Sequence, residues 1–250
     1  MEVQADLTVL VVATGDEARL RRFLRFLVDG ADHVGLEVLV ALPEPVGNIA
    51  LLRDEFRDIV WIGRDRNRPP GVMINAALRR ACGRYFSLWD DAVVVADGCL
   101  ATLIDFLDEV PEAAIVGPKL RDQEGRIQPV ARTFPPLLSL LSSSAAPPGR
   151  PAPGWGEYAS GEANWFAGPG MMINRIFLDD ERGVHPRLFG WLWQLEICRR
   201  AVRAGWHVHY LHEAQATGSQ RNWLDAMGGE RGGGRRLWEW LLLLTGRWLG

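Results

Sequence analysis

The chain has 250 residues, of which 48% are hydrophobic and 24% charged, and its 28 Lys and Arg nearly balance 31 Asp and Glu to give a formal charge of -3. High hydrophobicity with low net charge excludes long intrinsic disorder, and the absence of a basic excess argues against a dedicated nucleic-acid binder. The widely spaced Cys82, Cys99 and Cys198 form neither a disulfide framework nor a zinc pattern and are typical of reduced, buried thiols. The acidic start of the chain predicts no signal peptide, and no apolar run reaches the length of a membrane span.

The first half of the chain alternates apolar runs with helical patterns. Leu7 to Ala13 is a continuous run rich in valine, which is typical of a strand buried on both faces. Residues 17–28 follow with the apolar spacing of a helix. The same alternation predicts strands at 36–42, 58–62, 85–88 and 113–116 and helices at 48–56, 71–82 and 97–107. This order of elements predicts βαβ units and therefore an α/β fold with a mainly parallel sheet.

The second half is less regular. Residues 125–134 indicate an edge strand or hairpin. Residues 135–160 are rich in Pro, Ser, Gly and Ala without periodicity, which indicates a surface loop or a lid over an active site. Beyond them we expect a strand with a glycine turn at 161–173, a helix at 188–204 and a strand at 207–211.

The end of the chain has a composition of its own. Residues 228–234 (GGERGGG) predict a flexible hinge. Residues 235–250 combine leucine and tryptophan with arginines near both ends, which indicates an amphipathic helix at a membrane interface. Such a helix would place a cytoplasmic protein on the inner face of the cell membrane. The alternative is that this segment packs on the domain or in a homodimer.

Ligands of an open parallel sheet bind at the carboxyl ends of its strands. The residues to inspect are therefore those at 14–16, 42–48 and 89–92 and those after Leu211. Among them Asp90 and Asp91 follow a hydrophobic strand, and two carboxylates at a strand end suit a hard divalent cation that bridges to phosphate oxygens. The alternative is a polar turn, where aspartate is common.

Five segments occur in an order that is known from one enzyme family. They are RPPGVMINAALRRACGRYFSLWDD (68–91), LATLIDFLDEVPEAAIVGP (100–118), LRDQEGRIQPVARTFP (120–135), NWFAGPGMMINR (164–175) and LFGWLWQLEICRRAVRAGWHV (188–208). In order and spacing they resemble the inverting family 2 glycosyltransferases of the GT-A fold, especially the rhamnosyltransferase-like branch. The resemblance runs from about Leu7 to Ser219.

The resemblance implies a GT-A-like domain at 1–227, with a nucleotide-binding half at 1–118 and an acceptor half at 119–227, followed by the hinge and tail at 228–250. It implies transfer of a sugar from a nucleotide-diphosphate-sugar donor to a cell-envelope glycan or a lipid-linked acceptor, with Mg²⁺ or Mn²⁺ as cofactor. We further expect the protein to form a homodimer or to associate with a partner transferase. We do not expect it to bind nucleic acid.

The resemblance also implies roles for single residues. Asp91 would be the direct metal ligand, assisted by Asp90. Thr14 and Asn75 would help to bind the donor nucleotide. Glu196 would be the candidate catalytic base, because it matches the last acid of the family's Glu-Asp-x-Asp cluster.

The sequence departs from the family at four polar positions. The acid that ends the second strand is replaced in the run Ala41-Leu42-Pro43, and Trp89 stands at the first position of the metal motif. The acidic cluster reads Trp193-Gln194-Leu195-Glu196, and Thr217-Gly218-Ser219 lies where the family has a late histidine. An inverting transfer needs a carboxylate to accept the proton of the acceptor hydroxyl. These losses favour an alternative function, in which a degenerate domain binds a glycan, a membrane or a partner without catalysis.

Aromatic residues and histidines supply two more hypotheses. Trp89, Trp191, Trp193 and Trp206 could line a sugar-binding cleft together with Gly168, or they could be core residues. In addition, a strand places the rings of His207 and His209 on one face, which is either a metal site or an exposed sheet surface.

Overall fold

The computed structural model describes residues 5–30, 34–43, 50–136, 149–153 and 155–227. The predicted hinge at 228–234 and tail at 235–250 lie outside these residues, as do parts of the strand-end segment 42–48 and of the loop 135–160. None of the helices in the described ranges is long and apolar enough to cross a membrane.

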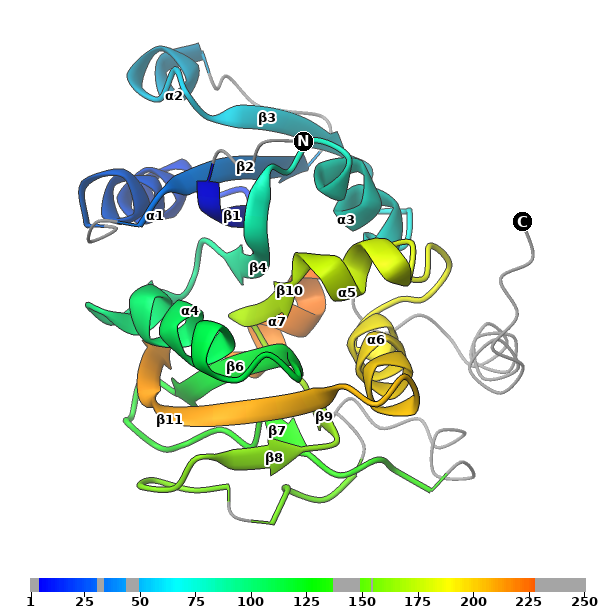
Figure 1. Cartoon of the computed structure of the whole chain (residues 1–250). Coiled ribbons are helices and arrows are strands. Elements are labelled where there is room, and N and C mark those ends of the chain that lie inside the picture. Colours follow the sequence, from blue (N-terminus) through cyan, green and yellow to red (C-terminus); the bar gives the residue numbers. More distant parts are fainter. Residues whose placement is uncertain (1–4, 31–33, 44–49, 137–148, 154, 228–250) are drawn as a thin grey trace.

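The first half of the chain forms the βαβ units that the alternation of apolar runs predicts (Figure 1). Its elements are β1 (Ala5–Val12), α1 (Glu17–Gly30), β2 (Leu36–Pro43), α2 (Ala50–Glu55), β3 (Val60–Arg64), α3 (Pro70–Leu78), β4 (Gly83–Asp90), β5 (Val94–Val95) and α4 (Cys99–Glu109). The two-residue strand β5 was not predicted, and β3 ends two residues later than the predicted strand at 58–62.

The second half contains more and shorter elements than the sequence analysis predicts. They are β6 (Ala113–Arg121), β7 (Ala131–Arg132), β8 (Gly161–Ala163), β9 (Trp165–Phe166), β10 (Met171–Asn174), α5 (Arg175–Asp180), α6 (Leu192–Arg203), β11 (His207–Thr217) and α7 (Gln220–Ala226). The expected strand at 161–173 is thus three strands, and the expected edge strand at 125–134 is reduced to β7, which pairs with β9 in a small second sheet.

The main sheet has the order β3-β2-β1-β4-β10-β6-β11-β5, with β8 paired to β11 (Figure 1). Neighbours β3, β2, β1 and β4 are parallel, and β6 and β11 are parallel to each other. The short strand β10 runs antiparallel to both β4 and β6. Two parallel blocks joined by one reversed strand form the mainly parallel sheet that was expected.

The end of β11 corrects the position of one candidate site. The strand continues past Leu211 to Thr217, with a shift in its register against β6 between Leu211 and Gln215. Such an irregularity bends a strand without ending it. The residues after Leu211 are therefore in a strand, and Gly218 is the residue that reaches the carboxyl edge of the sheet.

The core explains why the first half was predictable. Leu20, Phe23, Leu24 and Leu27 form the apolar face of α1, and each is at most 3% exposed. Burying a side chain of this size contributes roughly 1.5–3 kcal/mol. Strand β1 is buried along nearly its whole length, as expected for a strand with both faces covered.

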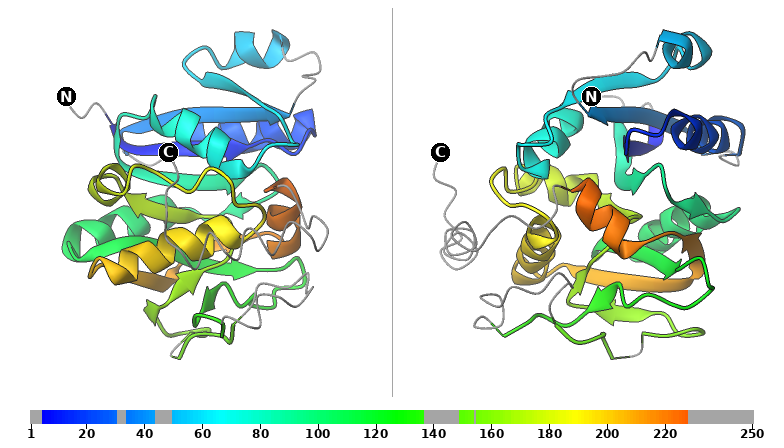
Figure 2. Two further views of the ribbon diagram at one scale, coloured as in Figure 1. Left: turned by 90° about the vertical axis from the view of Figure 1, so that its right-hand side faces the viewer. Right: turned by 180° about the vertical axis from the view of Figure 1, so that it is seen from behind.

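Because β1, β4 and β11 run in the same direction, their carboxyl ends meet at one edge of the sheet. The register pairs Val12 with Asp90, and Thr217 pairs with Val94 just beyond β4. Seen from behind, α7 (orange) lies in front of this part of the fold (Figure 2).

Candidate functional site

The ends of β1 and β4 are joined by a hydrogen-bonded link. The backbone N–H of Thr14 donates to both carboxylate oxygens of Asp91, each at 3.1 Å. Asp91 is 1% exposed. Burial raises the pKa of this carboxyl group, and the hydrogen bonds from Thr14 lower it. Asp91 therefore fixes the backbone where β1 ends.

Asp90 is more deeply buried than its neighbour. Its Oδ1 accepts a hydrogen bond from the backbone N–H of Ala92 at 2.9 Å, whereas its Oδ2 has no partner among the residues that the structure describes. Burial raises the pKa of Asp90 to about 7. An ionised oxygen without a partner is costly to bury, so burial favours the neutral acid.

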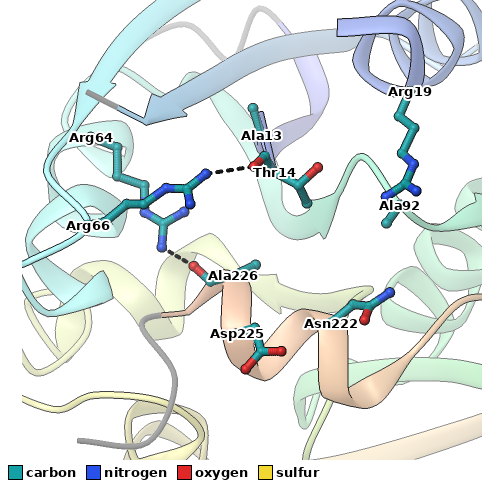
Figure 3. Close-up of a pocket in the computed structure, with 9 residues that line it drawn as sticks. All are labelled: Ala13, Thr14, Arg19, Arg64, Arg66, Ala92, Asn222, Asp225 and Ala226. Atoms are coloured by element: carbon teal, nitrogen blue, oxygen red, sulfur yellow. Dashed lines mark hydrogen bonds between the residues drawn. The ribbon is translucent and has the colours of Figure 1, made fainter. Parts of the chain in front are cut away.

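A cavity of about 270 Å³ opens at this edge of the sheet between β1, β3 and α7 (Figure 3). It is lined by Ala13, Thr14, Arg19, Arg64, Arg66, Ala92, Asn222, Asp225 and Ala226. Figure 3 shows Arg64 and Arg66 entering from one side, Arg19 from the opposite side, and the two polar residues of α7 from below. We call this space the arginine cavity.

Backbone carbonyl groups orient two of the guanidinium groups. Arg66 Nη2 donates to the carbonyl oxygen of Thr14 at 2.6 Å, and Arg64 Nη2 donates to the carbonyl oxygen of Ala226 (Figure 3). Burial and the nearby charge of Arg66 lower the pKa of Arg64 to about 10, which leaves it protonated at neutral pH. Two like charges are thus held close together at the wall of a cavity, an arrangement that favours an anionic ligand.

A second cavity, of about 300 Å³, shares Arg64 with the first. It lies at the start of α3 and is lined by Gly63, Arg64, Asp65, Arg68, Pro69, Pro70, Val72, Met73 and Ala76. Asp65 supplies an acid just after β3, whereas the strand beside it, β2, ends without one at Pro43. The register pairs Pro43 with Arg64, so the two strand ends are neighbours.

The two aspartates do not fit a divalent cation that bridges to a ligand in the arginine cavity. Neither Asp90 nor Asp91 lines that cavity, and their exposed fractions are 0% and 1%. Mg²⁺ usually keeps several of its waters when it binds to protein carboxylates, and a fully enclosed pair leaves no room for them. In the described part of the chain, the group of three or more acidic, His or Cys side chains that could hold a metal ion contains neither residue.

Helix α7 closes the candidate site from the acceptor half and was not predicted. The Ser219 side chain caps it by accepting a hydrogen bond from the Asn222 N–H at 3.3 Å. Trp223 is buried, and its Nε1 donates to Oε1 of Gln194 at 3.0 Å, while Gln194 Nε2 donates to the Gly168 carbonyl oxygen at 2.7 Å. The Gln194 amide therefore joins α6 to α7 through its oxygen and to the segment between β9 and β10 through its nitrogen.

The segment that matches the family's acidic cluster is buried as a whole, from Trp193 to Glu196. Glu196 is 9% exposed and forms an ion pair with Arg200, Nε to Oε1, at 2.8 Å. Burial raises the pKa of Glu196, and Arg200 lowers it. Glu196 does not line the arginine cavity. Its role as a catalytic base stays a prediction, and the structure gives it a competing role as a structural anchor.

Glu196→Gln separates the two roles. We expect the free energy of unfolding to fall by roughly 1.5–3 kcal/mol, because a hydrogen bond between charged groups is lost in a buried place. We expect the turnover of folded protein to change little. Chemical denaturation and an activity assay on the same sample check both quantities. A drop in turnover of a hundredfold or more without any loss of stability would identify Glu196 as the base.

Three residues of the predicted sugar cleft are core residues, so that part of the prediction is wrong. Trp89 and Trp193 are 0% exposed. Trp89 packs against Gly170, whose φ of +86° and lack of a side chain make room for the indole ring. Gly168 is also buried, and a Cβ there would lie 3.0 Å from Val130. A ring that stacks on a sugar needs a solvent-accessible face, which these side chains do not have.

The other two tryptophans are partly exposed but lie apart from the arginine cavity. The ring of Trp191 lies 6.0 Å from that of Trp165, and the ring of Trp206 lies 6.0 Å from that of Phe177. Neither residue lines the cavity. Trp191 as a residue of an acceptor cleft stays a prediction.

Asn75 connects α3 to the loop before α6. Its Nδ2 donates to the Val184 carbonyl oxygen at 2.8 Å, and its Oδ1 accepts from the Val184 N–H at 3.0 Å. Both polar atoms of the Asn75 side chain are therefore engaged in holding α3 against this loop. Thr14 lines the arginine cavity and Asn75 does not, and the donor-binding role of both residues stays a prediction.

The same loop contains a buried histidine that predicts a pH dependence. Burial, together with the charges of Arg200 and Arg187, lowers the pKa of His185 to about 4. Its Nδ1 accepts a hydrogen bond from the Arg187 N–H at 3.2 Å, which requires the neutral ring. A lowered folded-state pKa gives stability that is present above pH 6.5 and is lost as pH falls toward 4.

We therefore expect His185 alone to remove up to about 3 kcal/mol of unfolding free energy between pH 7 and pH 4. Urea unfolding at both pH values measures this difference. His185→Gln keeps a hydrogen-bond acceptor but cannot titrate, so its loss over the same range is expected to be smaller by that amount. An identical pH profile for both proteins would contradict the assignment.

The late histidine of the family has no counterpart at its expected place. A Cβ at Gly218 would lie 2.8 Å from Val93, so the topology does bring Thr217 and its neighbours to the Asp90–Asp91 turn. The histidines lie elsewhere. His207 and His209 share a face of β11 with Glu162 of β8, and the ligand atoms of all three lie within 4.8 Å of one another. His207 pairs with Ala113 at the start of β6, so this cluster lies at the opposite edge of the sheet.

Comparison with known proteins places this geometry in a structural family. The chain superimposes on GalNAc-T7 in complex with UDP, GalNAc and Mn²⁺ with a TM-score of 0.63 at 11% identity, covering 87% of this chain and 44% of that one. For Staphylococcus aureus TarS with UDP-GlcNAc the TM-score is 0.61 at 14% identity, covering 96% and 71%. For a Pyrobaculum calidifontis mannosyltransferase with GDP-Man and Mn²⁺ it is 0.57 at 16%, covering 86% and 56%. The chain has a GT-A glycosyltransferase fold.

A sequence relative refines this placement within the GT-A proteins. The N-acetylglucosaminyl-diphospho-decaprenol L-rhamnosyltransferase of Mycobacterium tuberculosis is 26% identical over 238 residues, covering 85% of this chain and 78% of the relative. No family model matches. The resemblance to the rhamnosyltransferase-like glycosyltransferases is thereby confirmed.

Most of the residues that line the arginine cavity were not predicted from the sequence. Arg64 ends β3 and Arg66 follows it, and this strand end was not among those inspected. The alternation of charges in Arg64-Asp65-Arg66 was the signal that could have found them. Asn222 and Asp225 lie on α7, whose start is marked by the capping residue Ser219.

Proposed function

We propose that the chain is a glycosyltransferase that binds a nucleotide-diphosphate-sugar donor at the arginine cavity. The sugar would be transferred, with inversion at the anomeric carbon, to a lipid-linked or cell-envelope glycan. The observation that carries this proposal is the position of an arginine-lined cavity at the carboxyl edge of a parallel sheet. This edge is where open α/β sheets bind nucleotides.

The lining residues supply what the donor requires. Guanidinium groups match the geometry of phosphate oxygens and stay charged at every physiological pH. The leaving group of the reaction is a nucleoside diphosphate, so positive charge at this place stabilises the charge that develops as the glycosidic bond breaks. The neighbouring cavity around Asp65 extends the site from the phosphates toward a nucleoside.

The reaction also needs a group that accepts the proton of the acceptor hydroxyl. Among the described residues that line the arginine cavity, Asp225 is the one carboxylate, and it is exposed on α7. We assign it as the candidate base, with Glu196 as its competitor. Asp225→Asn changes one atom on an exposed helix and should leave stability unchanged, in contrast to Glu196→Gln.

The relatives suggest the chemical class of both substrates. The mycobacterial relative is named for rhamnosyl transfer to N-acetylglucosaminyl-diphospho-decaprenol. For this chain we propose a donor of the same class, a nucleotide diphosphate deoxyhexose or hexose, and a polyprenyl-diphosphate-linked acceptor. Such an acceptor resides in a membrane, which agrees with the expectation that the protein acts at the inner face of the cell membrane.

One observation favours a second candidate function, a binding module without turnover. The segment that matches the family's acidic cluster is buried, and Gln194 in it is engaged at both ends by Gly168 and Trp223. If Asp225 cannot act as the base, the fold would bind a nucleotide sugar or a glycan without transferring it.

The test is a transfer assay with the full chain. UDP-, dTDP- and GDP-sugars are each incubated with a polyprenyl-diphosphate-linked N-acetylglucosamine acceptor, and the release of nucleoside diphosphate and the lipid product are measured. We expect turnover with one donor and an inverted product, and a loss of at least a hundredfold in turnover for Asp225→Asn. Donor binding without any transfer supports the binding module, and no donor binding contradicts both the transferase and a module that binds a nucleotide sugar.

A further inference from the structure

The lining of the arginine cavity carries a positive charge that the chain as a whole does not have. Arg19, Arg64 and Arg66 line it together with a single acid, Asp225, although the formal charge of the protein is -3. Arg19 forms an ion pair with the exposed Asp16 at 3.2 Å. No carboxylate in the described ranges forms an ion pair with Arg64, which is 6% exposed. A buried guanidinium without a carboxylate partner is costly unless an anion binds beside it.

Asp91 of the metal motif supports the cavity through the backbone of Thr14. Asp91 holds the Thr14 N–H with both oxygens, and the Thr14 carbonyl oxygen in turn accepts the hydrogen bond from Arg66. Asp91 therefore positions the backbone of Thr14, and Thr14 in turn positions Arg66. Asp91 is a support for the cavity and is not part of its surface.

A fixed cation already lies beside the aspartates. The positive charge of Arg19 acts on both Asp90 and Asp91 and lowers the pKa of each, against the larger effect of burial, which raises them. Arg19 lines the cavity, as does Ala92, the residue after the pair (Figure 3). A guanidinium group of the cavity lining thus lies close enough to both acids to act on their charge.

We propose that Arg19, Arg64 and Arg66 take the place of the divalent cation, so that the chain binds the diphosphate of its donor without metal. This inference rests on the proposed function and goes beyond it by assigning the source of charge compensation. The lining of the cavity holds three guanidinium groups and one carboxylate, so the positive charge that a diphosphate requires is supplied by the protein itself.

The arginines are sufficient for the charge balance of the reaction. The acceptor oxygen attacks the anomeric carbon, the bond from that carbon to the diphosphate oxygen breaks, and its electron pair stays on the diphosphate. The proton of the acceptor passes to a carboxylate of the protein. The only new charge in the donor site is on the diphosphate, and bidentate hydrogen bonds from arginine can stabilise it there.

The test is a calorimetric titration of the full chain with UDP, dTDP and GDP, once in EDTA and once in Mn²⁺. We expect one nucleotide to bind in EDTA, with an affinity that Mn²⁺ changes by less than about threefold. Arg66→Gln and Arg64→Gln are each expected to weaken binding in EDTA by about 10-fold to 100-fold, the range for one charged hydrogen bond. Arg57→Gln removes the same charge from an exposed position outside the cavity and should leave the affinity unchanged.

Two further controls make the outcomes distinct. His207→Ala removes the other candidate metal group, so a Mn²⁺ effect that persists in this variant does not come from the Glu162 cluster. Thermal unfolding of each arginine variant shows whether it is folded. Binding that requires Mn²⁺ and is lost in Asp91→Asn would overturn this inference and leave the proposed function intact. No binding of any nucleotide under either condition would overturn both.

Discussion

Trp193→Ala is expected to lower the free energy of unfolding by about 3–5 kcal/mol, the usual cost of removing a large aromatic side chain from a core. Trp193 is 0% exposed and belongs to the hydrophobic core on the inner face of α6. Its Nε1 has no hydrogen-bond acceptor within the described residues, so the loss comes from packing. Urea unfolding followed by circular dichroism measures it.

Two matched variants sharpen this prediction. Trp193→Phe keeps most of the ring volume and removes the unpaired indole N–H, so we expect a smaller loss. Trp191→Ala alters the partly exposed neighbour and is expected to cost less than Trp193→Ala. The core assignment would be wrong if Trp193→Ala kept full stability and instead lost affinity for a sugar ligand.

Gln194→Glu is expected to destabilise the protein by roughly 3–5 kcal/mol at pH 8, the range for an uncompensated buried charge. The substitution restores an acid at a position where the family has one. One oxygen of the new carboxylate can still accept the hydrogen bond from Trp223. The other would face the Gly168 carbonyl oxygen, which now lies 2.7 Å from the amide nitrogen.

The pH dependence of this variant is the decisive readout. Burial raises the folded-state pKa of the new acid above its unfolded value. Its destabilising effect is therefore absent at low pH, where a protonated carboxyl can donate to Gly168, and grows as pH rises through the folded-state pKa. Gln215→Glu, on an exposed position of β11, should show no such profile. A stability difference between Gln194→Glu and the unsubstituted protein that is the same at pH 8 as at pH 5 would contradict the buried network.

The fold was predictable for those elements whose residue pattern directly reflects which side chains are buried. The valine-rich run of β1 and the apolar spacing of α1 are properties of the chain itself, and both elements were found. The strands β8, β9 and β10 were merged into one, because each is only two to four residues long and is defined by its partner strands. Pairing of this kind is set by tertiary contacts, which a single sequence does not display.

The candidate site was predictable in position but not in composition. The rule for strand ends led to Thr14, Asp90 and Asp91, and these residues do lie at one edge of the sheet. The rule could not predict that the aspartates are buried, because their burial depends on the residues that pack over the turn. Arg64 was missed because β3 ends later than its apolar run, and Asp225 was missed because α7 is short.

The most direct test of the account is a crystal structure of the protein with the nucleoside diphosphate that binds best, grown in EDTA. We expect the diphosphate in the arginine cavity, with phosphate oxygens within hydrogen-bond distance of Arg64 and Arg66 and the nucleoside extending toward Asp65. A nucleotide bound elsewhere, or one held through a cation on Asp91, would contradict the central claim that this GT-A fold binds its donor with arginine in place of metal.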